Sequence, residues 1–142
     1  MSDTAYEERI VRTMEAFLKN RYDVSRFAER TAAADYLADE IRGKRVGFGD
    51  SETLRALSLY ERLSMHNEVI DPPRAGHVGG IEAFLAAGRE ALMTDVFLLS
   101  ANAITEQGQI FNMDGAGNRV AGSLFGHEKT YFVVGINKLV PD

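Results

Sequence analysis

A glycine-containing turn joins an apolar segment to the expected start of a helix, in the residues Val46-Gly47-Phe48-Gly49-Asp50-Ser51-Glu52-Thr53. Glycine allows a tight turn and a close backbone approach to a ligand, and the free N–H groups of a helix N-terminus favour a phosphate or a carboxylate. We predict a ligand-binding loop formed by Gly47, Gly49, Ser51 and Thr53. The alternative is an ordinary turn with Asp50 or Ser51 as N-cap, because the complete dinucleotide and P-loop fingerprints are missing.

A second glycine loop also leads into an expected helix, and it places an arginine in the first turn of that helix. A cation is unfavourable at a helix N-terminus unless an anion lies nearby. Arg119 therefore either pairs with an acid, such as Asp114 or Glu106, or contacts an anionic ligand. The predicted ligand-binding residues of this loop are Asp114, Gly115, Gly117, Asn118 and Arg119.

A third group of polar residues follows the most apolar segment of the chain, in Ser100-Ala101-Asn102-Ala103-Ile104-Thr105-Glu106-Gln107-Gly108. Glu106 is a candidate general acid/base or carboxylate nucleophile, and Asn102 is a candidate group for orienting a carbonyl or hydroxyl. The alternative makes Glu106 an exposed hairpin residue and Asn102 a turn former.

The sequence favours neither a metal site nor a thiolate site. Its three histidines, His66, His77 and His127, lie in separate segments, whereas a metal site needs about three or four ligands. The chain has no cysteine, so it supplies no ligand for a cysteine-bound iron–sulfur cluster and no thiol nucleophile. No cofactor can be named from these residues. His77 lies in a proline- and glycine-rich segment from which it could reach a substrate.

The elements that must position these groups alternate between strands and helices. The 142 residues are expected to form one domain with an α/β fold, a mainly parallel sheet and right-handed crossovers. The residues Asp71-Pro72-Pro73-Arg74-Ala75-Gly76 are read as a loop, and Gln107-Gly108 as the turn of a hairpin. Strands are expected at 22–27, 45–48, 67–70, 96–99 and 129–135. Helices are expected at about 4–20, with Thr4 and Glu7 as a capping box, from Thr31 to Gly43, over Leu54 to Leu63, at 81–93 and at 118–125.

Charge and hydropathy exclude several partners. The net charge of −5 argues against binding to a nucleic-acid backbone, which favours a basic excess. The apolar runs are too short to span a membrane, and the acidic, polar start of the chain does not resemble a signal peptide. We therefore expect a cytoplasmic protein.

The residues from Thr94 to Asp142 resemble the LUD family, which is named for lactate utilisation and includes lactate-utilisation protein C. The shared succession is an Asn-Ala-Ile segment, a Glu-x-Gly turn, a Gly-x-Gly-Asn-Arg-Val loop, then Phe-Gly and Val-Gly-x-Asn-Lys. Upstream, Arg12-Thr13-Met14-Glu15-Ala16 resembles the opening helix of the family, and Val46 to Leu54 resembles its Gly-Gly-Ser-x-Thr-Leu loop.

This resemblance implies a three-layer α/β/α fold similar to the sugar-phosphate isomerase and CoA-transferase superfamily, whose members bind phosphorylated sugars or CoA esters at glycine-rich loops. The Glu106-Gln107-Gly108 turn resembles the turn that bears the CoA-transferase nucleophile. The chain departs from the family at Phe48, Asp50 and His127. Family members also continue past the Asn-Lys segment, so the chain is expected to be a C-terminally truncated domain.

Three functions remain open at this point. The first is an accessory or ligand-binding subunit in lactate oxidation, with a small anionic organic acid or phosphorylated ligand and with redox centres on iron–sulfur partners. The second is a stand-alone isomerase or CoA-transferase-type enzyme in which Glu106 is the base or the nucleophile. The third is a ligand-sensing module with no chemistry of its own.

Overall fold

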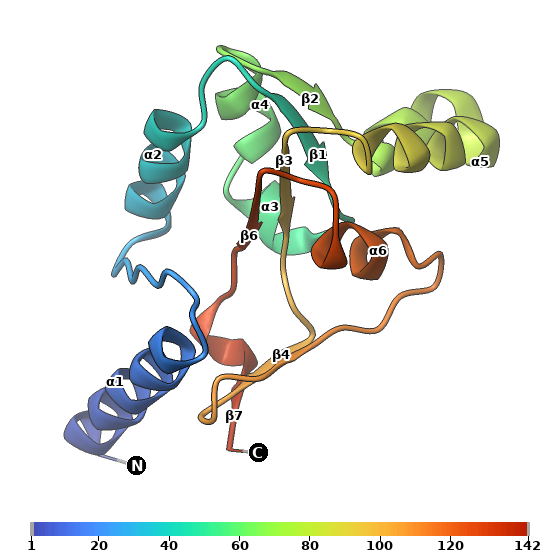
Figure 1. Cartoon of the computed structure of the whole chain (residues 1–142). Coiled ribbons are helices and arrows are strands. Elements are labelled where there is room, and N and C mark those ends of the chain that lie inside the picture. Colours follow the sequence, from blue (N-terminus) through green and yellow to red (C-terminus); the bar gives the residue numbers. More distant parts are fainter. Residues whose placement is uncertain (1, 142) are drawn as a thin grey trace. The chain divides into compact units, whose positions relative to one another are not determined.

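The computed structural model describes residues 2–141 and divides the chain into two compact units. The larger unit contains Phe27–Ser100 and Met113–Val134. The smaller unit is formed by the described parts of Met1–Arg26, Ala101–Asn112 and Gly135–Asp142. Each unit is described by itself below, with the elements labelled as in Figure 1.

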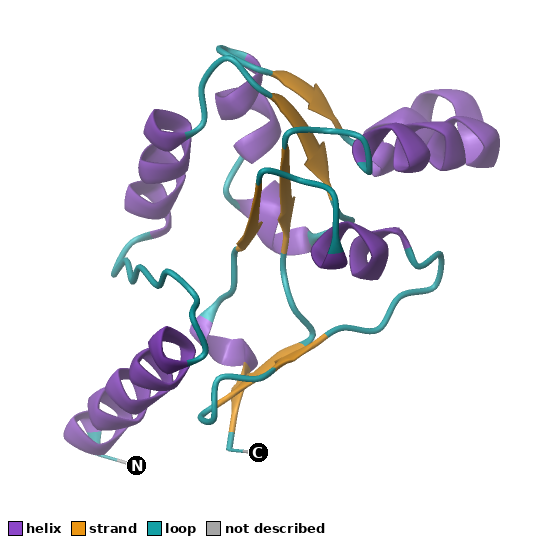
Figure 2. Cartoon of the chain, in the orientation of Figure 1, coloured by secondary structure: helices purple, strands orange, loops and turns teal. Residues whose placement is uncertain are grey.

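The larger unit is built on a four-stranded sheet in the order β2-β1-β3-β6, and all of its strand pairs are parallel. Its strands are β1 (Arg45–Phe48), β2 (Glu68–Ile70), β3 (Val96–Leu99) and β6 (Lys129–Phe132). All four residues of β3 are buried, because parallel neighbours flank this strand and helices cover its two faces. The predicted parallel sheet is confirmed, and Figure 2 shows its strands.

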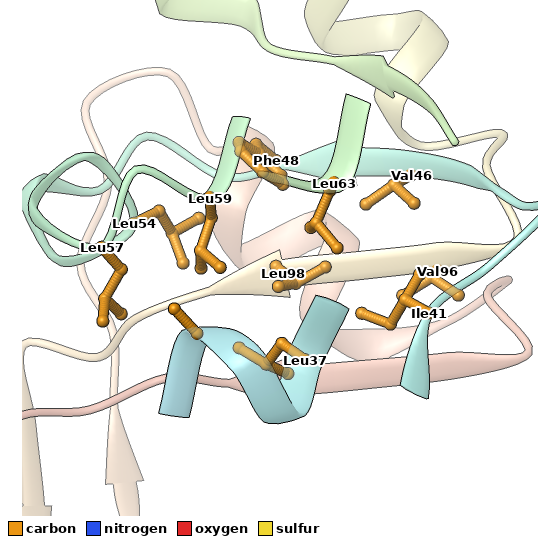
Figure 3. Packing of buried hydrophobic residues seen from close by; sticks show 11 residues of the cluster. Leu37, Ile41, Val46, Phe48, Leu54, Leu57, Leu59, Leu63, Val96 and Leu98 are labelled. Atoms are coloured by element: carbon orange, nitrogen blue, oxygen red, sulfur yellow. The ribbon is translucent and has the colours of Figure 1, made fainter. Parts of the chain in front are cut away.

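One face of this sheet packs against α2 (Arg30–Glu40), α3 (Glu52–Ala56) and α4 (Leu59–Ser64). Alternate side chains of the central strands point toward these helices, and Figure 3 shows the resulting apolar cluster. Its buried members are Ala34, Leu37, Ile41, Val46, Phe48, Leu54, Leu57, Leu59, Leu63, Val96 and Leu98. The single helix expected over Leu54 to Leu63 is two helices, because Ser58 adopts a left-handed conformation with φ of 50°.

The opposite face of the sheet packs against α5 (Pro72–Ala91), which consists of two helical segments joined by a kink at Gly80, where φ is 72°. α6 (Asn118–Leu124) also lies on β3. Phe97 and Leu99 join Ala87 and Ala91 of α5 in a second buried cluster. A Cβ on Gly122 would lie 2.4 Å from the Phe97 ring, so this glycine allows α6 to approach the strand closely. The larger unit therefore has the predicted three-layer α/β/α arrangement.

The smaller unit combines α1 (Asp3–Lys19) with a three-stranded sheet in the order β5-β4-β7. Its strands are β4 (Ala103–Thr105), β5 (Ile110–Phe111) and β7 (Leu139–Val140), and the short 3-10 helix η1 (Ile136–Lys138) precedes β7. β4 and β5 form the expected hairpin, and Gly108 in its turn has a φ of 75°. That value favours glycine.

Several local predictions were wrong. The N-cap of α1 is Ser2 rather than Thr4, since the Ser2 hydroxyl accepts from the Ala5 N–H at 3.3 Å. Residues 22–27 form no strand; the Tyr22 ring instead packs edge-on against Phe17, with centroids 5.4 Å apart. The expected loop at 71–76 is the first part of α5, with Asp71 as N-cap and prolines in the first turn.

Along the described part of the chain, no helix combines the length and the apolar character that crossing a membrane requires.

Candidate functional site

The topology of the larger unit marks one place at the edge of its sheet. From β1, the chain passes through α3 and α4 to β2 on one side, whereas β3 and then β6 lie on the other side. Ligands of open α/β sheets bind at the carboxyl ends of the strands, where the strand order reverses. In this sheet that place lies between the ends of β1 and β3.

The loop after β1 is held at this place by backbone and hydroxyl contacts. The Gly49 N–H donates to the Leu98 carbonyl at 2.8 Å, and the Ser51 hydroxyl accepts from the Leu54 N–H at 3.3 Å. The Thr53 hydroxyl lies 3.4 Å from that of Ser100 at the end of β3. Ser51 is therefore the N-cap of α3, as the alternative interpretation predicted, and α3 is only five residues long.

Gly47 lies within β1 rather than in the loop. A Cβ at this position would lie 2.4 Å from the Ala91 carbonyl oxygen and 2.7 Å from the Thr94 hydroxyl oxygen. The missing side chain lets α5 pack directly against the strand. Gly49, in contrast, brings the two glycine loops together, because a Cβ there would lie 3.1 Å from Cγ of Arg119.

The charge of Arg119 is balanced inside its own loop. Its Nε donates to Asp114 Oδ1 at 2.7 Å, and its Nη2 donates to the Met113 carbonyl at 2.7 Å. Asp114 Oδ2 also accepts from the Val120 N–H at 2.6 Å, while the N-cap, Gly117, makes no side-chain cap bond. The sequence left open whether Arg119 pairs with an acid or contacts an anionic ligand. The structure shows the ion pair with Asp114.

The other predicted residues of this loop differ in surroundings. Gly115 is exposed and would accept a Cβ without a contact within 4 Å. A Cβ on Gly88 of α5 would lie 4.0 Å from the Asn118 Cβ, so Asn118 lies close to α5. The Nδ2 of Asn118 is buried without a hydrogen-bond partner.

Glu106 and Asn102 belong to the smaller unit. Glu106 forms an ion pair with Arg9 and a second, 3.4 Å contact with Arg12, both from α1. A hydrogen bond from Arg9 Nε lowers the pKa of Glu106 against the opposing effect of burial, and Arg12 lowers it further. Asn102 lies beside the hairpin, where its backbone N–H donates to the Phe111 carbonyl at 2.9 Å. Glu106 is therefore held as a charged carboxylate by two arginines of its own unit.

An open cavity of about 530 Å³ lies beside the loop after β1, at the carboxyl ends of β1 and β2. Its size suits a small-molecule ligand. Phe48, Leu54 and Val78 contribute apolar surface, and the polar groups come from α3, α4, α5 and the loops between them. These polar lining residues are Ser51, Arg55, Ser58, Tyr60, Glu61, Asp71, Arg74 and His77.

Two arginines dominate this cavity. Arg74 lies 3.7 Å from the centroid of the Tyr60 ring and donates to Glu61 at 2.8 Å. Arg55 donates to Asp50 at 3.0 Å and also pairs with Glu52. Both arginine side chains remain about half exposed, so an incoming anion can reach them without unfolding the site.

Asp71 is the most enclosed carboxylate of this cavity. Its side chain is 14% exposed, and Oδ1 accepts from the Arg74 N–H at 3.5 Å. Burial raises the pKa of Asp71, although the Arg74 N–H and the charges of Arg74 and Arg55 oppose the change. This carboxyl therefore holds its charge less readily than an exposed aspartate.

The sequence interpretation placed His77 near a substrate but missed Arg55, Arg74 and Asp71. The signal was present in Asp71-Pro72-Pro73, because an aspartate followed by proline is typical of a helix start. A helix beginning there would have put Arg74 and His77 on one face. Among residues 2–141, no group of three or more His, Asp or Glu side chains is arranged to hold a metal ion.

Comparison with known proteins identifies one family. The model of the LUD domain matches residues 10–142, which is more than half of the chain. No curated protein and no solved structure matches the chain. The match includes the glycine loop after β1, the cavity residues and the Arg119 loop, and the chain therefore belongs to the LUD domain family.

Proposed function

We propose that this chain is a ligand-binding accessory subunit in the utilisation of lactate or a related organic acid. Its ligand is a small anion, a carboxylate or a phosphorylated compound, bound at the carboxyl ends of β1 and β2. The oxidation itself takes place on iron–sulfur partner proteins. Membership of the LUD domain family supports the metabolic setting.

The observation that carries this proposal is the cavity with its two accessible arginines. Arg55 and Arg74 reach it from different helices, and each is bound by exposed carboxylates that a ligand carboxylate can replace. Arginine binds carboxylates and phosphates through two parallel N–H bonds. Val78, an exposed side chain of α5, provides apolar surface for the rest of a small ligand, and the buried Phe48 and Leu54 lie beneath the cavity.

The surroundings of the Glu106 carboxylate argue against a catalytic role for this residue. They therefore favour a ligand-binding function over an enzymatic one. A general base that works near neutral pH needs a raised pKa, whereas Arg9 and Arg12 lower the pKa of Glu106. As a nucleophile, Glu106 would first have to leave an ion pair with Arg9. We therefore assign Glu106 a structural role.

The redox partners are proposed from composition and family together. The sequence contains no cysteine, so it provides no thiolate ligands for an iron–sulfur cluster. We therefore assign the iron–sulfur clusters of such a lactate-oxidising system to partner proteins.

The test combines growth with binding. Deleting the gene should impair growth on lactate, and the wild-type gene should restore it, whereas the Arg55→Ala/Arg74→Ala variant should not. Arg42→Ala is the matched control, because Arg42 is an exposed arginine with a single long ion pair outside the cavity. Calorimetry of the purified protein with lactate, pyruvate and phosphate should show binding that only the double variant loses.

Two results would count against the proposal. Normal growth of the deletion strain on lactate would contradict the proposed metabolic role. Equal ligand affinity in the wild type and the double variant would show that the ligand does not bind in this cavity. A separate experiment tests the accessory role. The protein purified from cells should carry iron–sulfur proteins with it, and purification without them would contradict this role.

A further inference from the structure

The cavity has no excess of positive charge before any ligand enters. Among the residues that line it, Arg55 and Arg74 provide two positive charges and Glu61 and Asp71 provide two negative ones, while Asp50 and Glu52 also pair with Arg55. An anionic ligand would therefore leave at least one uncompensated negative charge in a partly enclosed site. Such a charge is costly unless a proton or another cation accompanies it.

Asp71 is the group best placed to take up that proton. Its side chain is 14% exposed, whereas that of Glu61 is 63% exposed and receives a 2.8 Å hydrogen bond from Arg74. The contacts of Asp71 with Arg74 are longer, at 3.5 Å to the backbone N–H and 3.9 Å to Nε. Asp71 thus combines the greater burial with the weaker compensation.

We infer that the cavity binds its anion together with a proton, and that the Asp71 carboxyl is the site of proton uptake. This inference rests on the proposed function, since it concerns the same cavity. The neutral carboxyl no longer repels the ligand, and its O–H can donate to an anionic oxygen. The guanidinium groups of Arg55 and Arg74 provide the positive charge.

The helix N-terminus itself contributes little to this site. Pro72 and Pro73 have no N–H, and the Arg74 N–H is already bound by Asp71. The anion is therefore recognised by side chains, which makes its affinity depend on the ionisation of the residues around it.

The charged and titratable groups that face Asp71 come from each neighbouring element. Asp50 lies in the loop after β1, and Arg55 follows it in α3. Tyr60 and Glu61 line the cavity from α4, and Arg74 and His77 line it from α5 itself. His77 is the competing proton acceptor, so the experiment must separate it from Asp71.

The sign of the pH dependence follows from the favoured protonation state. A ligand that prefers the neutral carboxyl binds more tightly as the pH falls. Between the pKa values of Asp71 in the free and bound protein, affinity should fall by up to about tenfold for each unit of rising pH. Binding in that range should take up as much as about one proton per ligand.

Isothermal titration calorimetry with pyruvate tests this, because the pyruvate carboxylate stays ionised from about pH 5 to 8. Titrations in buffers with different ionisation enthalpies give the number of protons taken up. Asp71→Asn should abolish the uptake and the pH dependence of affinity, while the asparagine still caps α5. Uptake should persist in His77→Gln and in Glu82→Gln, which removes an exposed charge from α5 outside the cavity.

Each outcome has a distinct meaning. Pyruvate binding without proton uptake overturns the inference and leaves the proposed function standing. Uptake that persists in Asp71→Asn and disappears in His77→Gln also overturns the inference, because it assigns the proton to the histidine. Absence of pyruvate binding by the wild-type protein overturns the inference together with the ligand site on which it rests.

Discussion

Arg9 and Glu106 form an ion pair although 97 residues separate them in the chain. The pair joins α1 to the hairpin of β4 and β5 inside the smaller unit. Asn20, at the other end of α1, reinforces the same connection by donating to the carbonyls of Gln107 and Gly108 at 3.2 and 3.0 Å. The hairpin turn is therefore anchored on the helix by side chains.

Glu106→Gln should lower the urea concentration at which the protein unfolds at neutral pH. Arginines lower the pKa of Glu106 in the folded state, so its stabilising effect is complete above the unfolded pKa of about 4.3. That effect is lost as the pH falls through the folded pKa. The unfolding midpoints of the wild type and the variant should therefore converge in acid. Glu15→Gln, at an exposed position of α1, is the control; an equal shift there would contradict the assignment.

Asp114→Ala should destabilise the larger unit by about 2–4 kcal/mol. The substitution leaves Arg119, whose side chain is 14% exposed, without its carboxylate partner and also removes the acceptor for the Val120 N–H. Chemical denaturation measures this loss. Asp39→Ala provides the comparison, because that side chain is 78% exposed and its pair with Arg42 is long. We expect the control to lose less than about 1 kcal/mol.

Gly122→Ala should cost about 1–3 kcal/mol, because the added methyl group would overlap the buried ring of Phe97. Either α6 or the ring must move to make room. Gly115→Ala is the matched control in the neighbouring loop, where a Cβ meets nothing within 4 Å. Thermal unfolding of the two variants compares them directly, and equal melting temperatures would show that α6 packs less closely than described.

His127 should carry its proton on Nδ1. This nitrogen lies 2.7 Å from the Thr94 carbonyl, which can only accept a hydrogen bond, while Nε2 is buried without a hydrogen-bond partner. The ring also stacks on Phe97, with centroids 4.9 Å apart. Nitrogen chemical shifts of the imidazole in an NMR spectrum distinguish the two tautomers. A neutral ring with its only proton on Nε2 could not donate to this carbonyl and would contradict the assignment.

The strands of the larger unit were predictable where the sequence contains continuous apolar residues. Val96 to Leu99 and Arg45 to Phe48 were predicted with the observed bounds, because buried parallel strands need no alternation. Residues 22–27 contain Tyr22, Val24 and Phe27 among polar residues, but they form no strand. Strand pairing depends on neighbours distant in sequence, and a local pattern does not contain that information.

The candidate site was only partly predictable for the same reason. Ser51 as an N-cap and the Asp114–Arg119 pair are local relationships, and the sequence analysis contained both of them. The partners of Glu106 lie in α1, and no spacing rule connects such distant residues. A loop at residues 71–76 does not predict the cavity, because Arg74 is positioned by the helix that begins at Pro72.

The smaller unit is assembled from three separate stretches of chain, and this has a consequence for the order of folding. β4 pairs with β7, so its parallel ladder forms only after Leu139 and Val140 have been synthesised. In contrast, β1, β2 and β3 all lie within the first hundred residues. β1, β2 and β3 can therefore pair while the chain is still being synthesised, before the sheet of the smaller unit has all of its strands.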